Sequence, residues 1–153
     1  MDDNVGKVLA TTQNNGLNDN TIVIFTNDNG GPGSKDSTSN YPLRGHEGSL
    51  YEGGIRVPLA MSWPGVIKPG SVITTPVITM DILPKILEAG GEKVDPEWAL
   101  DGTSLLPLFN KSESRFPKRT LYWQRSSLNG PVALQEGKWQ LLARNTSNNT
   151  PEL

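Results

Sequence analysis

The sequence predicts an α/β unit followed by a small antiparallel β segment. A helical pattern of apolar residues precedes a short β-branched run at 21–25, and a second strand-like run at 55–63 precedes another helical pattern at 77–89. Three short apolar runs separated by turn residues then follow toward the carboxyl end. With 153 residues, 35% of them hydrophobic, the chain is the size of one ordinary domain.

The amino-terminal part predicts a helix, a strand and a long loop. Apolar residues recur at helical spacing over 2–14, and Asn14-Asn15-Gly16 follows as a stop signal. The continuous β-branched and aromatic run at 21–25 lies between polar segments and predicts a buried strand of a parallel sheet. Nearly every residue from 30 to 40 is polar, Gly or Pro, so we expect a surface loop without packing contacts there.

The rest of the chain predicts a second strand, a helix and a β meander. Pro58 within the run at 55–63 indicates an edge or irregular strand. Apolar residues repeat at helical spacing over 77–89 and stop at Gly90-Gly91. A short apolar turn is expected at 105–109, and three hairpin-linked strands at 121–123, 132–134 and 138–142. A frayed polar tail is expected at 145–150. Two central strands make a sheet too narrow to cover itself, so we expect part of a larger domain to lie outside these residues.

The composition argues against several classes of function. Sixteen acidic and 14 basic side chains give a net charge of -2, which does not attract a polyanion, so we expect no nucleic-acid partner. No apolar run reaches the roughly 18 residues that a membrane span needs, so we expect no membrane association. Without cysteine, the chain has no disulfide, no thiolate metal site and no cysteine nucleophile.

A carboxylate and an amide, Asp28 and Asn29, follow closely after the predicted strand at 21–25. In open α/β sheets ligands bind outside the carboxyl ends of the strands, and these oxygen donors suit Ca²⁺ or Mg²⁺. The surrounding Asn-Asp-Asn-Gly-Gly is also ordinary turn chemistry, and the pattern taken alone favours the turn.

Residues 42–58 alternate glycines with charged and hydrogen-bonding groups, a pattern that can gather polar groups around an anion. His46 is the only histidine and the obvious candidate for a general acid or base, although a lone histidine is more often a hydrogen-bonded bystander. Two arginines of the segment could clamp an anion or could pair with its two glutamates. The arginines are Arg44 and Arg56, and the glutamates are Glu47 and Glu52.

Five segments carry a resemblance to a known family. They are 21–31, 42–58, Trp-Pro-Gly at 63–65, Thr-Met-Asp-Ile-Leu-Pro at 79–84 and Leu-Asp-Gly-Thr-Ser-Leu-Leu-Pro at 100–107. In this order they resemble the type I sulfatases, arylsulfatase-like enzymes of the alkaline phosphatase superfamily. The longest and most specific match is Leu-Arg-Gly-His-Glu-Gly-Ser-Leu-Tyr-Glu-Gly-Gly-Ile-Arg-Val-Pro at 43–58.

For the fold, the resemblance implies a partial alkaline-phosphatase-like sheet with flanking helices plus a small C-terminal antiparallel β segment. It implies a partial sulfatase α/β domain at 1–110 and a truncated antiparallel subdomain at 111–153. Only the carboxy-terminal portion of a sulfatase is matched, so we expect the protein to continue beyond both ends. Relatives are usually periplasmic, secreted or lysosomal, while the sequence itself does not assign a location.

For the site, the resemblance implies hydrolysis of sulfate esters at a Ca²⁺ site to which Asp28 and Asn29 contribute ligands. His46 is the catalytic candidate and Arg44 a substrate-binding candidate, and Glu47 stands where most relatives place a sulfate-binding lysine. The family's formylglycine nucleophile lies in Cys/Ser-x-Pro-x-Arg, a motif that does not occur here. The early acidic pair that completes the cation site is absent as well, so we expect the chain alone to be inactive.

Three hypotheses about function remain open from the sequence. The chain could be a fragment of a sulfatase-family hydrolase whose substrate is a sulfate ester. It could instead be a non-catalytic calcium- or sulfate-binding remnant that acts with another chain supplying the amino-terminal half. The third hypothesis is a structural remnant without activity.

Overall fold

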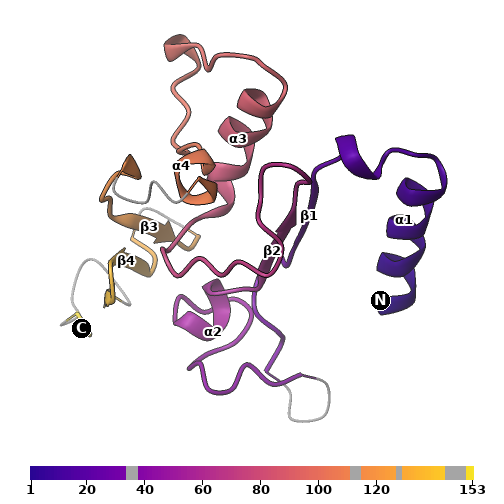
Figure 1. Cartoon of the computed structure of the whole chain (residues 1–153). Coiled ribbons are helices and arrows are strands. Elements are labelled where there is room, and N and C mark those ends of the chain that lie inside the picture. The colour runs from indigo at the N-terminus through magenta and orange to yellow at the C-terminus, as the bar shows by residue number, and fades with distance from the viewer. Residues whose placement is uncertain (34–37, 111–114, 127–128, 144–150) are drawn as a thin grey trace. The chain divides into compact units, whose positions relative to one another are not determined.

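A computed structural model of the chain describes residues 1–33, 38–110, 115–126, 129–143 and 151–153 (Figure 1). Contacts group the chain into two compact units. The first unit comprises Met1–Phe25, Leu59–Thr74 and Thr79–Phe116, and the second comprises Thr26–Pro58, Thr75–Ile78 and Pro117–Leu153. Within the described ranges, no helix has the length and apolar character needed to cross a membrane.

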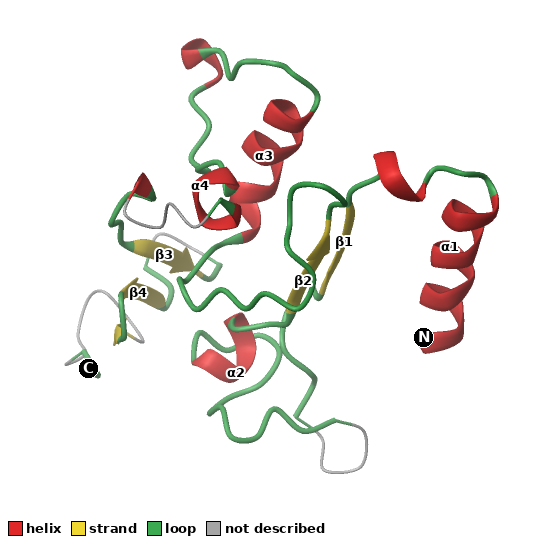
Figure 2. Ribbon diagram, in the orientation of Figure 1, coloured by secondary structure: helices red, strands yellow, loops and turns green. Residues whose placement is uncertain are grey.

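Helix α1 (Asp2–Asn14) opens the first unit and agrees with the predicted helix (Figure 2). Asp2 and Asp3 lie in its first turn, where negative charge is favourable at the positive end of the helix dipole. At its end Asn15 Nδ2 donates to the carbonyl of Thr11 at 2.8 Å. None of its residues is buried, so this helix gains little from packing within the described residues.

Strands β1 (Val23–Thr26) and β2 (Leu59–Ser62) form a two-stranded sheet. Thr26 Oγ1 donates to the carbonyl of Pro58 at 2.9 Å, which brings the end of β1 to the start of β2. Paired strands of four residues can meet in this way only if they are antiparallel. The prediction of a parallel arrangement of these two strands was therefore wrong. The prediction of a buried strand at 21–25 was also wrong, because no residue of β1 is buried and Phe25 is 39% exposed.

Helix α3 (Ile82–Ala89) lies in the best-packed part of the first unit. The chain enters it through a 3₁₀ turn, η2 (Thr79–Asp81), so the helix begins five residues later than the apolar pattern predicts. Asp81 is fully buried and accepts a hydrogen bond from the backbone N–H of Thr103 at 2.9 Å. Further buried side chains of this unit include Lys85, Leu105, Leu108 and Phe116. The unit also contains the 3₁₀ helices η1 (Asn18–Asn20) and η3 (Pro96–Trp98) and the short helix α4 (Leu106–Phe109).

The second unit contains the short helix α2 (Glu52–Ile55) and an antiparallel sheet in the order β3-β4-β5. The strands β3 (Leu121–Gln124), β4 (Val132–Glu136) and β5 (Trp139–Ala143) confirm the predicted meander. The register pairs Ala133 with Trp123 and with Leu142, so the side chains of these residues share one face of the sheet. Leu121, Ala133 and Leu142 on this face are buried.

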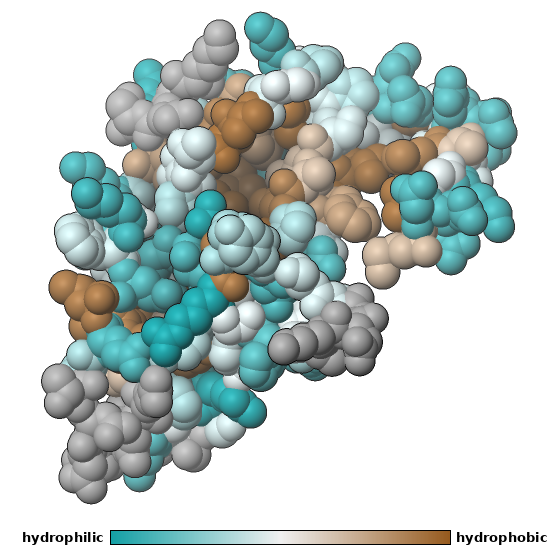
Figure 3. All heavy atoms as spheres, turned by 90° about the horizontal axis from the view of Figure 1, so that it is seen from below, coloured by the Kyte–Doolittle hydropathy of each residue, from teal (hydrophilic) through white to brown (hydrophobic). Residues whose placement is uncertain are grey.

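These contact units cut across the predicted division at residue 110, because the loop at 26–58 groups with the carboxy-terminal strands. The assignment of 1–110 and 111–153 as domains stays a prediction. The frayed tail predicted at 145–150 lies outside the described residues. Apolar side chains are visible at the surface in Figure 3, and Val8, Met80 and Ile86 of the first unit are 60%, 47% and 49% exposed.

Candidate functional site

Asp28 and Asn29 lie in the loop directly after β1, in the second unit. Asp28 Oδ1 accepts a hydrogen bond from the backbone N–H of Asn29 at 2.9 Å, as in an Asx turn. Asn29 Nδ2 donates to the carbonyl of Gly30 at 2.9 Å, which fixes the orientation of its amide. Within the described residues, neither the amide oxygen of Asn29 nor the second carboxylate oxygen of Asp28 takes part in a hydrogen bond.

Glycines let this loop lie directly against the segment at 42–54. A β-carbon on Gly30 would lie 1.7 Å from the carbonyl oxygen of Gly53, and one on Gly53 would lie 2.4 Å from that of Gly45. On Gly54 it would lie 2.1 Å from the carbonyl oxygen of Ser49. No side chain fits at these backbone contacts. The close approach of the two loops requires glycine at position 30, and close contacts within the 42–54 segment require Gly53 and Gly54.

Backbone hydrogen bonds hold the two loops together. The N–H of Gly30 donates to the carbonyl of Gly54 at 2.9 Å, and the N–H of Glu47 donates to the carbonyl of Gly31 at 2.9 Å. Asn40 bridges the loops, since its Oδ1 accepts from the N–H of Gly31 at 2.9 Å while its Nδ2 donates to the carbonyls of Gly31 and Gly45 at 3.0 and 3.2 Å. The loop that carries Asp28 and Asn29 thus contacts the loop that carries His46.

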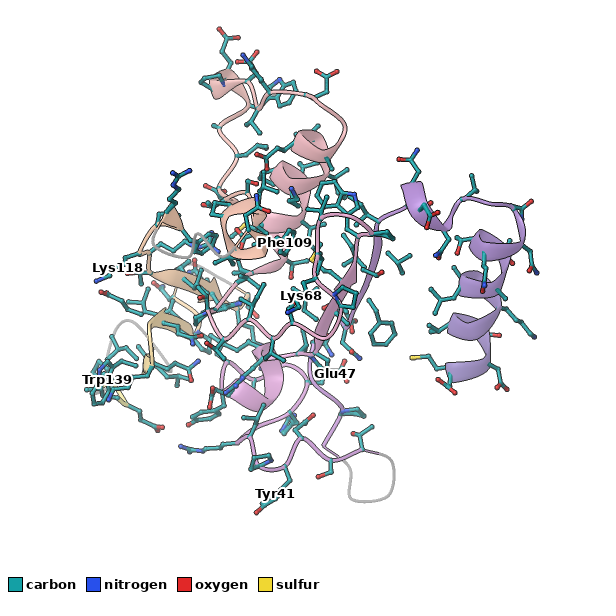
Figure 4. The ribbon with its side chains drawn as sticks, in the orientation of Figure 1. Tyr41, Glu47, Lys68, Phe109, Lys118 and Trp139 are labelled. Carbon is teal, nitrogen blue, oxygen red and sulfur yellow. The ribbon has the colours of Figure 1, made fainter. Side chains whose placement is uncertain are left out.

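His46 and Glu47 are both exposed on this glycine-rich loop, and Figure 4 labels Glu47. His46 Nδ1 lies 2.7 Å from the carbonyl oxygen of Glu47. A carbonyl only accepts hydrogen bonds, so Nδ1 carries the proton and Nε2 of the neutral ring is the accepting nitrogen. The backbone N–H of His46 donates to Ser49 Oγ at 3.1 Å, which helps to fix the backbone at His46.

Arg44 forms an ion pair and an aromatic contact within the second unit. Its Nη1 lies 3.2 Å from Glu152 Oε2, and its guanidinium lies 3.9 Å above the centre of the Tyr51 ring. Tyr51 also donates its hydroxyl to Glu152 Oε2 at 3.0 Å. Both arginines that the sequence offered as anion ligands form ion pairs, Arg44 with Glu152 and not with Glu47, and their role in binding an anion stays a prediction. The second pair is Arg56 Nη1 with Glu52 Oε1, at 3.0 Å.

Three residues that support the site could not be singled out from the sequence. Asn40 lies in the stretch predicted to lack packing contacts, yet it is half-buried and bridges both loops. Tyr51 and Glu152 meet across 101 positions of sequence, a distance over which no spacing pattern exists. Their signal is long-range pairing, which a single sequence does not reveal.

The donor set suits a hard cation but is incomplete. Carboxylate and amide oxygens are ligands that Ca²⁺ takes, and it needs 6 to 8 of them. Asp28 and Asn29 offer two side chains, and the described residues contain no group of three or more Asp, Glu, His or Cys that could hold a metal. The two residues therefore fit a Ca²⁺ site to which further ligands must come from elsewhere.

Comparison with known proteins identifies the fold first. The solved structure of Ps i-CgsB in complex with k-i-k-neocarrahexaose matches with a TM-score of 0.84 at 32% identity, covering 96% of this chain and 32% of that one. The chain accordingly has part of an alkaline-phosphatase-like fold.

The family follows from the sequence matches. The family model described as Sulfatase matches residues 1–92, and the chain belongs to the sulfatase family. Steryl-sulfatase of Rattus norvegicus is 41% identical over 115 residues, covering 71% of this chain and 20% of that protein. A sulfatase of Formosa agariphila is 38% identical over 135 residues, covering 80% of this chain and 24% of that protein. The chain thus spans about a quarter or less of the length of these curated relatives.

Proposed function

We propose that residues 26–33 and 38–58 form one part of the active site of a sulfatase, which hydrolyses sulfate esters. The observation that carries the proposal is the contact between the Asp28-Asn29 loop and the His46 loop, made by the backbone bonds of Gly30 and Glu47. Membership of the sulfatase family supports the reaction class.

In this proposal Asp28 and Asn29 bind Ca²⁺ through their carboxylate and amide oxygens. The ion, when bound, would act as a Lewis acid that withdraws charge from sulfate oxygens. His46, held through Nδ1 on the carbonyl of Glu47, presents Nε2 to the ester. That nitrogen accepts a hydrogen bond when the ring is neutral and donates one when it is protonated.

Glu47 favours a second candidate function, a non-catalytic cation-binding partner of another chain. A carboxylate at this position would repel the sulfate that a lysine would attract. Two unit charges 4 Å apart interact by about 1 kcal/mol in water and about 4 kcal/mol at an effective dielectric constant of 20. Because Glu47 is exposed, the lower figure applies to it. The substitution Glu47→Lys reverses the sign of this interaction.

In the experiment this chain is joined to the amino-terminal portion of the Formosa agariphila sulfatase. That portion ends at the residue where the similarity to this chain begins. Aryl sulfate hydrolysis is measured in Ca²⁺ with Glu47 and with Glu47→Lys. We expect the Glu47→Lys form to turn over at least about tenfold faster, since a swing of about 2 kcal/mol is more than tenfold in rate.

Asp28→Ala in the faster form should lower turnover by about 100-fold or more, since the groups of such a site act as a unit. The control is Asp19→Ala, which removes an exposed carboxylate from η1 in the first unit. Absence of hydrolysis both with Glu47 and with Glu47→Lys would contradict catalysis and favour the binding function. Equal turnover of the two forms would show that residue 47 does not approach the sulfate.

A further inference from the structure

A third arginine of the second unit, Arg125, lies beside the glycine-rich loop. Its guanidinium atoms Cζ, Nη2 and Nη1 lie 3.7, 3.7 and 3.9 Å from the position that a β-carbon on Gly48 would occupy. These nearly equal distances mean that the planar group faces Gly48. Since Gly48 has no side chain, the guanidinium can lie close to the backbone of this loop.

The backbone fixes Arg125 at this place. It directly follows β3, and its N–H donates to the carbonyl of Pro131 at 3.0 Å, one step beyond the Gln124–Val132 pair of the β3-β4 register. The next residue, Ser126, has a φ of +72°, in the left-handed region. The side chain is exposed and can reach a ligand from solvent.

The other arginines of the loop are already paired. Arg44 pairs with Glu152 and Arg56 with Glu52, whereas no carboxylate of the described residues forms a salt bridge with Arg125. Glu47, next to Gly48, likewise has no ion pair within the described part of the chain. Arg125 is therefore a cation beside residues 46–48 whose charge is not neutralised there.

We propose that Arg125 binds a sulfate group of the substrate beside Glu47 and Gly48 and contributes the positive charge that Glu47 does not provide. The inference rests on the proposed function for the class of substrate. A guanidinium offers parallel N–H donors that match two oxygens of a tetrahedral oxyanion. These donors lie in the plane of the guanidinium, at its edge, and the exposed side chain of Arg125 leaves them accessible to an anion beside Gly48.

The test measures inorganic sulfate binding by the 153-residue chain, followed by NMR at the amides of Glu47 and Gly48. Arg125→Ala should weaken sulfate binding by about tenfold or more, as loss of a charge-assisted hydrogen bond does. Arg125→Lys keeps the charge but not the paired donors, so it should bind sulfate with intermediate affinity. Lys118→Ala is the charge-matched control, because Lys118 is exposed and lies well apart from Glu47 in Figure 4.

Three results would overturn the proposal: no sulfate binding by the unaltered chain, equal binding by Arg125→Ala, or equal weakening by Arg125→Ala and Lys118→Ala. The last result would indicate that sulfate binding depends on the net charge of the chain and not on a specific site at Arg125. The probe needs neither Ca²⁺ nor turnover, so this test is separate from that of the proposed function. If the joined enzyme fails to hydrolyse aryl sulfate while sulfate binding still depends on Arg125, the hydrolase proposal is wrong and the anion site stands.

Discussion

At the scale of single residues, glycine determines how closely the two site loops approach. Gly30 lies against the backbone of Gly53, where the neighbouring atoms are a carbonyl group and cannot move aside like a flexible side chain. The N–H of Gly30 itself donates to the carbonyl of Gly54 at this approach. A single methyl group at position 30 would separate the loops.

Gly30→Ala should lower the free energy of unfolding by about 1–3 kcal/mol, the usual cost of overpacking, because its β-carbon would lie 1.7 Å from the carbonyl oxygen of Gly53. The control is Gly6→Ala in α1, which has nothing within 4 Å. That change should raise the free energy of unfolding by up to about 1 kcal/mol, since alanine is the better helix former. The free energy of unfolding of both variants is measured by urea denaturation. Equal changes in the two variants would mean that the loops do not pack as described.

At the scale of elements, Lys85 joins α3 to its neighbours. The side chain is 1% exposed, and its Nζ lies 4.4 Å from the centre of the Trp63 ring and 5.6 Å from that of Phe109 in α4. Nζ also lies 3.5 Å from Glu88 Oε2, which in turn accepts a hydrogen bond from Ser104. Desolvation by burial lowers the pKa of Lys85 from its ordinary 10.5, and the charge of Glu88 opposes the shift in part.

This lowered pKa makes stability depend on pH with a definite sign. Between the lowered pKa and 10.5, the unfolded chain binds more protons than the folded one, so the free energy of unfolding rises with pH. The slope from this one group is at most about 1.4 kcal/mol per pH unit. Lys85→Met should remove that rise in alkaline urea titrations, while Lys7→Met, at an exposed position of α1, should leave it unchanged. If the free energy of unfolding of Lys85→Met still rises with pH, the rise comes from another titrating group.

The elements also show how far sequence patterns reach. Local spacing located α1, α3 and the meander of β3, β4 and β5, because each depends on periodicity within one segment. The direction and exposure of β1 were missed, since both depend on what the strand pairs with. At the site, residues 28, 29, 46 and 47 came from the motif, whereas Asn40, Tyr51, Glu152 and Arg125 required the folded contacts.

At the scale of the whole molecule, the central question is whether this chain provides part of a cation site. In the proposed function Asp28 and Asn29 bring two ligating side chains, and the chain spans only 20% and 24% of two sulfatase relatives. A cation that needs 6 to 8 oxygens should bind such a partial site weakly. Under the proposed function, complete binding requires ligands from the remainder of a sulfatase.

The most direct test is calorimetric titration of Ca²⁺ into three proteins: the 153-residue chain, the chain joined to the Formosa agariphila amino-terminal portion, and the joined protein with Asp28→Ala. We predict a Kd weaker than about 1 mM for the chain alone, at or beyond the weak end of protein sites, and affinity at least about tenfold tighter in the joined protein. Asp28→Ala should abolish that gain. Micromolar binding by the chain alone, or joined proteins that bind equally with and without Asp28, would contradict the account.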